Sequence, residues 1–323
     1  MRGFPFFIAG VALLIWSFNS SLIAPPPAGK TKLIAHRGAH QVHDTAGVDA
    51  QTCTAERIEP PVHPYLENTI EGMRAAFDAG ADIVELDVHL TPDGKFAVFH
   101  DWTLDCRTNG KGVTEETPMA VLKTLDIGYG YTADGGKTFP FRGKGIGLMP
   151  TLDEVFAALP SGKFLINFKS RREEEGAALA GMLNERPEWR ETVFGVYGGG
   201  EPTDRAIADV AGLRGYTAAS AKSCLLSYLG TGWIGHVPEA CRNTLVPVPE
   251  NYAWLLWGWP NRFMTRMHEA GSEVILLGPY GSEGWTSGID TPNQLAGIPD
   301  RFAGHVWTNR ILTMAPAVKE RQP

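Results

Sequence analysis

The sequence lacks any run rich in lysine and arginine, and this absence excludes partners that need a concentrated positive surface. Its 323 residues contain 29 Lys and Arg against 36 Asp and Glu, which gives a formal net charge of −7. Nucleic acids and anionic membrane surfaces are bound by clustered positive charge. We therefore expect no nucleic-acid partner, although a few cations gathered in one pocket could still bind a small phosphate compound.

The apolar stretch at the N-terminus is too short for a typical membrane-spanning helix. Phe4–Trp16 follows Met1-Arg2 and is succeeded by polar residues and then by three prolines. This order is typical of a secretory signal. Residues 1–28 are therefore predicted to direct export to the periplasm or out of the cell. Because Phe18 and Ile23 spoil the small-residue pattern of a cleavage site, an uncleaved membrane anchor is the alternative.

Cysteine pairs of the CxxC type are absent, which argues against a zinc ribbon and against a redox motif. The four cysteines form an even number in a chain expected to be exported, and disulfides persist outside the cytoplasm. Three pairings are open from sequence, and four free, partly buried thiols are the alternative. We expect Cys53 to pair with Cys106, and Cys224 with Cys241.

Short apolar segments alternate with helical patterns from Lys32 onward, and no repeat of fixed period is visible. Eight such segments separated by helices predict a parallel sheet, and eight strands close a (β/α)8 barrel. The predicted fold class is α/β, a (β/α)8 TIM barrel that fills residues 29–323 as one domain. The predicted strands are Lys32–His36, Ile83–Val88, Phe164–Lys169, Val193–Tyr197, Arg214–Thr217, Thr244–Val248, Glu273–Leu277 and His305–Thr308.

Two irregular stretches do not fit a minimal barrel. Ala39–Leu66 is a long loop insertion after the first strand, and Trp102–Pro150 is a small inserted unit after the second strand and the short strand Phe96–Phe99. Long loops inside a compact domain usually serve function, and both of these leave strands at the end where barrel active sites form. A bridge between Cys53 and Cys106 would join the two loops.

Ionisable residues gather at the C-terminal ends of the predicted strands. Residues two apart on a strand share a face, so Glu85 and Asp87 point the same way, as do Asn167 and Lys169. An interior carboxylate pair is costly to bury unless a cation compensates it, and Ca²⁺ or Mg²⁺ prefers such oxygen ligands. A solvated strand end paired with Lys or Arg is the alternative.

Two histidines and an arginine complete this set. His36-Arg37 ends the first strand, and His100 follows the short strand. Imidazole exchanges protons near neutral pH, as general acid–base catalysis requires. Arg37 can bind phosphate oxygens through two N–H groups, and Lys169 adds a point charge. One such residue alone means little, but together they predict a phosphate-processing site on one rim.

Four strings in this region carry a family resemblance. They are LIAHRGAH, ENTIEGMRAAFDAGADIVELDVHLTPDG, FAVFHDWTLDCRTNGKG and MPTLDEVF, in that order. They resemble the glycerophosphodiester phosphodiesterase family, whose fold is a TIM barrel. The match is dense from Lys32 to Lys169 and afterwards rests mainly on HVWTNR near the end. The resemblance implies an enzyme of lipid metabolism, which hydrolyses glycerophosphodiesters to glycerol 3-phosphate and an alcohol with a divalent cation.

The resemblance also implies a role for each site residue. His36 and His100 match the catalytic pair, and Glu85 and Asp87 match metal ligands. Arg37 and Lys169 match phosphate-contacting cations. Glu67 and Asn68 match the ENT motif beside the first histidine, and Trp307 lies at the end of the last strand, where an aromatic ring can wall the pocket. One departure is Asn167, which stands where the family has a third metal carboxylate. The lost charge predicts weaker binding of Ca²⁺ or Mg²⁺, softened by the amide oxygen.

Two other functions stay open from the sequence. A phospholipase-D-like enzyme acting on intact phospholipid would need an apolar entrance. The aromatic stretch of Tyr252, Trp254, Trp257 and Trp259 could supply one, with core packing as its alternative role. A non-catalytic binder of phosphorylated ligands is supported only by Asn167. Neither the alcohol group of the substrate nor the oligomeric state follows from the sequence.

Overall fold

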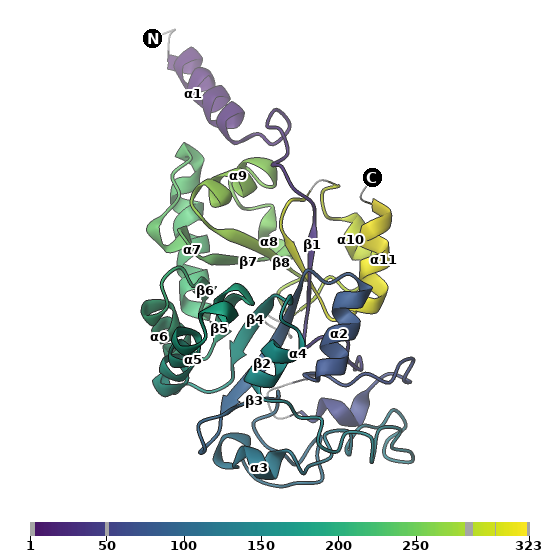
Figure 1. Ribbon diagram of the computed structural model, residues 1–323. Coiled ribbons are helices and arrows are strands. Elements are labelled where there is room, and N and C mark those ends of the chain that lie inside the picture. Colours follow the sequence, from purple (N-terminus) through teal and green to yellow (C-terminus); the bar gives the residue numbers. More distant parts are fainter. Residues whose placement is uncertain (1–3, 49–51, 282–286, 301, 322–323) are drawn as a thin grey trace.

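The centre of the molecule is a nearly closed barrel of parallel strands. The computed structural model describes residues 4–48, 52–281, 287–300 and 302–321. Within them the parallel strands are β1 (Lys32–Ala35), β2 (Ile83–Leu90), β4 (Phe164–Phe168), β5 (Val193–Gly198), β6 (Gly215–Tyr216), β7 (Leu245–Pro249), β8 (Glu273–Leu277) and β9 (His305–Thr308). Their order is β6-β5-β4-β2-β1-β9-β8-β7, with helices around them (Figure 1). The predicted TIM-barrel class is confirmed, and each predicted strand has its counterpart.

Side chains on the strands alternate between the barrel interior and the layer beneath the helices. On β2, the core beneath the helices contains Val84, Leu86 and Val88. Ile83 belongs instead to the interior cluster. Glu85 and Asp87 have the parity of Ile83 and are fully buried, so they face the interior as predicted.

The register of the sheet carries polar residues into one row. Asp87 of β2 pairs in register with Asn167 of β4. Asn167 in turn pairs with Tyr197 of β5. β3 (Phe96–Val98) runs antiparallel to the end of β2 and leads the chain to His100. The row lies toward the C-terminal ends of the strands, where parallel barrels place their sites.

Helices close the outside of the barrel. α2 (Ile70–Ala79) begins where the Thr69 hydroxyl accepts a hydrogen bond from the Gly72 N–H, and it ends at Gly80, whose φ of 118° favours glycine. The next helices are α4 (Leu152–Ala158), α5 (Glu173–Glu185), α6 (Glu201–Asp209), α7 (Ala218–Thr231), α8 (Glu250–Ala253), α9 (Asn261–Glu269), α10 (Pro292–Ala296) and α11 (Ile311–Arg321).

The two irregular stretches pack together into one lobe, at the lower end of the view in Figure 1. Among the described residues, the lobe comprises 39–48, 52–66 and 102–150 and holds η1 (Thr54–Arg57), η2 (Thr114–Glu116) and α3 (Met119–Leu122). It has a second hydrophobic core, in which Ile58 and Leu66 of the first stretch meet Leu122 and Tyr131 of the second. This shared core makes the two insertions one structural unit.

The cysteines pair as predicted. Cys53–Cys106 joins the two stretches of the lobe. Cys224–Cys241 joins α7 to η5 (Glu239–Cys241) in the outer layer. The two bridges therefore lie in different parts of the molecule, one in the lobe and one among the helices of the second half.

The N-terminal helix α1 (Phe4–Asn19) projects from the upper end of the molecule in Figure 1. No helix of the described residues is long and apolar enough to cross a membrane. The end of α1 is bound to the barrel, because the Arg266 guanidinium donates to Asn19 Oδ1 at 3.0 Å and to the Phe18 carbonyl at 3.1 Å. Helix and barrel are thus connected by polar contacts, and not by the chain alone.

Candidate active site

The polar residues predicted at the strand ends are brought together around Arg37, which follows β1. Its Nη1 donates to Glu67 Oε1 at 3.0 Å, and its Nε donates to His36 Nε2 at 3.1 Å. The same Nε lies 3.3 Å from Asp87 Oδ2. On the other side of Asp87, Lys169 Nζ is 3.5 Å from Oδ1. Both predicted cations therefore flank one buried carboxylate.

The backbone at this point adopts an uncommon conformation. Arg37 and Asn68 both have a φ of 56°, in the left-handed region that non-glycine residues rarely occupy. The Asn68 N–H donates to the Arg37 carbonyl at 3.0 Å, and the Arg37 N–H donates to Glu85 Oε2 at 3.1 Å. Such conformations persist where the surroundings fix them, and they cluster at functional sites. Here the turn directs the Arg37 N–H toward the interior carboxylates.

Each oxygen of the two interior carboxylates has a polar neighbour. Glu85 Oε1 accepts from the Tyr197 hydroxyl at 2.6 Å. Asp87 Oδ1 accepts from Asn167 Nδ2 at 2.8 Å, and Asp87 Oδ2 accepts from Asn68 Nδ2 at 2.9 Å. Arg37 and Lys169 approach the same two oxygens of Asp87, at 3.3 and 3.5 Å. The pair is thus a buried, hydrogen-bonded, negatively charged centre.

His36 is held from the second half of the barrel. Its Nδ1 lies 2.5 Å from Asn309 Oδ1, and Asn309 donates its backbone N–H and its side-chain amide to Asp290, at 2.6 and 2.8 Å. With the amide so fixed, its oxygen accepts, and the neutral imidazole carries its proton on Nδ1. Trp307 is fully buried, with its ring 5.0 Å from the His36 ring. Trp307 therefore packs against the histidine from inside the barrel.

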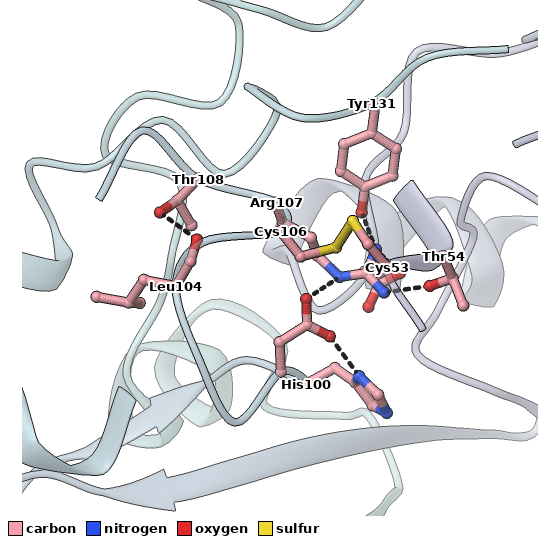
Figure 2. Close-up of a disulfide and its surroundings, with 10 residues drawn as sticks. Cys53, Thr54, His100, Leu104, Cys106, Arg107, Thr108 and Tyr131 are labelled. Carbon is pink, nitrogen blue, oxygen red and sulfur yellow. Dashed lines mark hydrogen bonds and ion pairs between the residues drawn. A yellow bond between two sulfur atoms is a disulfide. The ribbon is translucent and has the colours of Figure 1, made fainter. Parts of the chain in front are cut away.

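His100 is held from the lobe. Its Nδ1 lies 2.7 Å from Asp101 Oδ1, and Asp101 Oδ2 lies 3.0 Å from Arg107 Nε. In Figure 2, dashed lines join Arg107 and His100 to the carboxylate between them, which is that of Asp101. A carboxylate on Nδ1 orients the ring and leaves Nε2 to exchange a proton with a substrate. Both histidines therefore have Nδ1 fixed by an oxygen acceptor, and His36 Nε2 also accepts a hydrogen bond from Arg37 Nε.

Burial and the neighbouring charges together set the ionisation of the carboxylates. Burial and the neighbouring Asp87 raise the pKa of Glu85 to about 8. Burial also acts to raise the pKa of Asp87, but Lys169, His100 and Arg37 outweigh it and lower that pKa. For Glu67, Arg107 and Arg37 outweigh burial and lower the pKa to about 2. Asp87 and Glu67 are therefore ionised at neutral pH, and the interior pair carries about one negative charge.

The histidines are neutral at rest. Burial lowers the pKa of His36 well below its ordinary value, and the neighbouring Arg37 lowers it further. Burial lowers the pKa of His100 in the same way, with Arg37 and Lys169 adding to the shift. A neutral imidazole can accept a proton, and the negative charge of a bound phosphate would favour the protonated form. The site is therefore suited to proton transfer once an anion is present.

The donor set determines how well a divalent cation fits. Among the described residues, no group of three or more His, Cys, Asp or Glu side chains is placed to hold a metal ion. Glu85 and Asp87 offer oxygens of the kind Ca²⁺ and Mg²⁺ prefer, and Asn167 stands beside them. A Cβ at Gly198 would collide with Asn167 Oδ1, so the glycine provides the space for this amide. The residues fit a hard cation in type, with two carboxylates and one amide as the possible donors.

The aromatic stretch lies elsewhere. Trp254, Trp257 and Trp259 line a cavity of about 710 Å³ together with α1, and none of the site residues lines it. Trp254 is 73% exposed, so it is not part of a core. A smaller cavity of about 120 Å³ lies beside the site, lined by His40, His63, Asn309 and Arg310 among others.

Sequence reasoning did not assign roles to several residues that the structure places in the site. Asp101 directly follows His100, and Asn309 belongs to the HVWTNR string, so both carried a signal. Arg107, Tyr197 and Asp290 carried none, because only the folded barrel and lobe bring them to the histidines and to Glu85.

Comparison with known proteins adds a family to this geometry. Residues 36–186 match the model of the Glycerophosphoryl diester phosphodiesterase family. The chain is 37% identical over 140 residues to a glycerophosphodiester phosphodiesterase of Caldanaerobacter subterraneus, covering 43% of this chain and 45% of the relative. It is 34% identical over 106 residues to one of Bacillus altitudinis, covering 32% and 40%. The matched part thus spans less than half the length of these relatives.

Solved structures extend the likeness to the whole barrel. The glycerophosphoryl diester phosphodiesterase domain of a Mycobacterium tuberculosis protein has a TM-score of 0.62 at 17% identity, covering 91% of this chain and 100% of that domain. A phosphodiesterase of Oleispira antarctica, solved in complex with the product sn-glycerol-3-phosphate, has a TM-score of 0.55 at 17% identity, covering 94% and 99%. At these identities the structures show the shared fold alone.

Proposed function

We propose, from the match of residues 36–186 to the glycerophosphoryl diester phosphodiesterase family, that the chain hydrolyses glycerophosphodiesters to glycerol 3-phosphate and an alcohol. One observation carries the proposal. His36 and His100 each have Nδ1 fixed by an oxygen acceptor, and Arg37, Lys169 and an interior carboxylate pair lie between them.

The chemistry divides among these side chains. Arg37 and Lys169 bind the non-bridging phosphate oxygens and offset the charge that builds on them. One histidine accepts at Nε2 the proton of the nucleophile, which is water or a neighbouring substrate hydroxyl. As the new P–O bond forms and the bond to the alcohol breaks, the other histidine, protonated, gives its Nε2 proton to the leaving alkoxide. If a substrate hydroxyl attacks, a cyclic phosphate results, and water opens it in a second step.

We further propose that Ca²⁺ or Mg²⁺ takes part, held by Glu85 and Asp87 with the Asn167 amide. When bound, the cation polarises the phosphate and neutralises its charge. Support comes from the burial of both carboxylates in the barrel interior, because burying a carboxylate is costly unless a nearby positive charge compensates it. Because the set has only two carboxylates, the substrate phosphate would complete the coordination, and affinity for the free cation would be low.

The test is turnover of glycerophosphocholine by the purified chain, with Ca²⁺, with Mg²⁺, and with EDTA. We expect release of glycerol 3-phosphate with at least one cation and its loss in EDTA. Tight binding of glycerophosphocholine without turnover in any cation would instead identify a non-catalytic binder. Turnover in EDTA equal to that with cation would refute the metal proposal and leave the hydrolase proposal standing.

We also propose that the chain is exported and that its N-terminal segment attaches it to a membrane. The buried Arg266 donates through Nη2 to the Phe18 carbonyl at 3.1 Å, and the Asn261 N–H donates to Ser21 Oγ at 3.0 Å, so removal of the segment would take away both acceptors. On α1, Leu14 is 69% exposed, and such a surface suits the membrane interface. N-terminal sequencing of the exported protein tests this: an N-terminus after residue 21 would refute it.

The rival function is hydrolysis of intact phospholipid, which would need an apolar entrance at the site. The exposed Trp254 lies beside α1 and not beside the site, so it does not form such an entrance. Turnover of phosphatidylcholine vesicles should be compared with that of soluble glycerophosphocholine. We expect the soluble diester to be preferred, since the aromatic cavity and the catalytic residues are separate. Preference for vesicles would favour the phospholipase reading.

A further inference from the structure

Arg107 is a charged side chain buried in the lobe, and the proposed reaction gives it no direct task. Only 2% of its surface is exposed. Its Nη2 donates to Thr54 Oγ1 at 2.7 Å, and its Nη1 donates to the Tyr131 hydroxyl at 3.2 Å (Figure 2). Burying an arginine is costly unless its charge is paired. Two neighbouring carboxylates supply that pairing.

These carboxylates lead to the two ends of the site. Arg107 Nε lies 3.0 Å from Asp101 Oδ2, and the other oxygen of Asp101 holds His100 Nδ1. Arg107 Nη1 lies 3.4 Å from Glu67 Oε2, and the other oxygen of Glu67 holds Arg37. One guanidinium therefore fixes the carboxylate behind the general acid–base group and the carboxylate behind the phosphate-binding arginine.

The disulfide of the lobe sets the place of this guanidinium. Cys106 is the residue before Arg107, and Cys53 is the residue before Thr54, which accepts the Arg107 hydrogen bond. The bridge thus ties together the backbones that carry donor and acceptor. The Gly130 N–H donates to the Arg107 carbonyl at 3.2 Å, and a Cβ at Gly130 would collide with the Cys106 carbonyl. The backbone of Arg107 is therefore held from two sides.

We propose that Arg107 is a positioning residue that orients His100 through Asp101 and Arg37 through Glu67, and that the Cys53–Cys106 bridge fixes it in place. This inference rests on the proposed function only for its effect on turnover. The orientation of the His100 ring is independent of turnover. The lobe is then part of the active site, because it sets the tautomer of one histidine.

The experiment compares Arg107→Met with the unchanged protein, by kinetics on glycerophosphocholine and by ¹⁵N NMR of the histidine rings. The His100 signals are assigned by their loss in His100→Ala. In the unchanged protein we expect a neutral ring protonated on Nδ1. In Arg107→Met we expect a mixture of tautomers and a kcat lower by about tenfold to a hundredfold, the scale of a misplaced catalytic group, with KM changed less.

Two further variants separate positioning from folding. Arg107→Lys keeps the charge but loses the fork that reaches both carboxylates, so its kcat should lie between those of the full chain and of Arg107→Met. The double variant Cys53→Ser/Cys106→Ser should lower kcat and broaden or shift the His100 signals. Its matched control, Cys224→Ser/Cys241→Ser, removes the other bridge and should leave the His100 signals unchanged.

The outcomes are distinguishable. A folded Arg107→Met or Arg107→Lys with the unchanged tautomer and the unchanged kcat would overturn the proposal. Equal effects of the two disulfide variants on the His100 ring would overturn the role of the Cys53–Cys106 bridge. If the unchanged protein shows no turnover, the proposed function fails, and a tautomer shift in Arg107→Lys would still support positioning.

Discussion

The two halves of the barrel contribute to the site in different ways. The first half, with the lobe, supplies both histidines, both cations and the carboxylates next to them. The second half supplies Asn309 and Trp307, which contact His36, and Asp290, which holds the Asn309 amide. The family model likewise ends at residue 186. The difference teaches that the proposed reacting groups lie in one continuous segment together with the residues that hold His100, whereas the residues that hold His36 come from near the end of the chain.

The largest expected effect follows from removing a reacting group of the first half. His100→Ala should lower kcat/KM for glycerophosphocholine by about 10²–10⁴-fold, the usual contribution of a general acid or base. His268→Ala, which changes an exposed histidine of α9, is the matched control and should leave kcat/KM unchanged. Activity of His100→Ala at the level of the control would remove His100 from the mechanism.

A smaller effect is expected from an orienting group of the second half. Asp290→Asn loses the charge that fixes the Asn309 amide, so the amide can turn and its NH₂ can face His36. We expect kcat lower by about tenfold, since the ring is misoriented but present. Asp300→Asn makes the same change at an exposed position and should have no effect. A loss as large as that of His100→Ala would contradict the division between halves.

Metal affinity tests the effect of having Asn167, and not a third carboxylate, beside Glu85 and Asp87. Asn167→Asp restores a third carboxylate beside Glu85 and Asp87, and we expect it to tighten Ca²⁺ binding by about tenfold. Isothermal titration calorimetry of the purified chain measures this. Asn184→Asp adds the same charge at an exposed site of α5 and is the control. If Asn167→Asp leaves the affinity at the level of Asn184→Asp, the cation does not bind at this carboxylate pair.

The smallest effect concerns stability at acid pH. Burial, with a contribution from Lys169, lowers the pKa of His89 to about 4, so the folded state binds fewer protons than the unfolded state below the ordinary pKa of 6.5. Stability is therefore full above pH 6.5 and falls as the pH drops toward 4, by about 2 kcal/mol at pH 5 from His89 alone. Thermal unfolding in EDTA from pH 7.5 to 5 measures it. His89→Gln should flatten this decline, and an equally steep decline would exclude His89 as its source.

Sequence alone predicted the strands, because each is a short, mostly apolar run that alternates with helical patterns. It also predicted that Glu85 and Asp87 share an interior face, since strand periodicity fixes this. The carboxylate or amide behind each histidine could not be predicted in the same way. Arg107 reaches Glu67, and Asp290 reaches Asn309, only because the fold brings separate segments together, and no local pattern encodes such contacts. The lobe was read as two loops because its shared core exists only in the fold.

The central claim is that His36 and His100 act on one phosphodiester at the end of this barrel. Phosphorus NMR of glycerophosphocholine, incubated with the full chain and with His36→Ala/His100→Ala in parallel, tests it most directly. The account predicts a glycerol 3-phosphate signal from the full chain and none above background from the double variant. Equal signals from both proteins, or a product other than glycerol 3-phosphate, would contradict it.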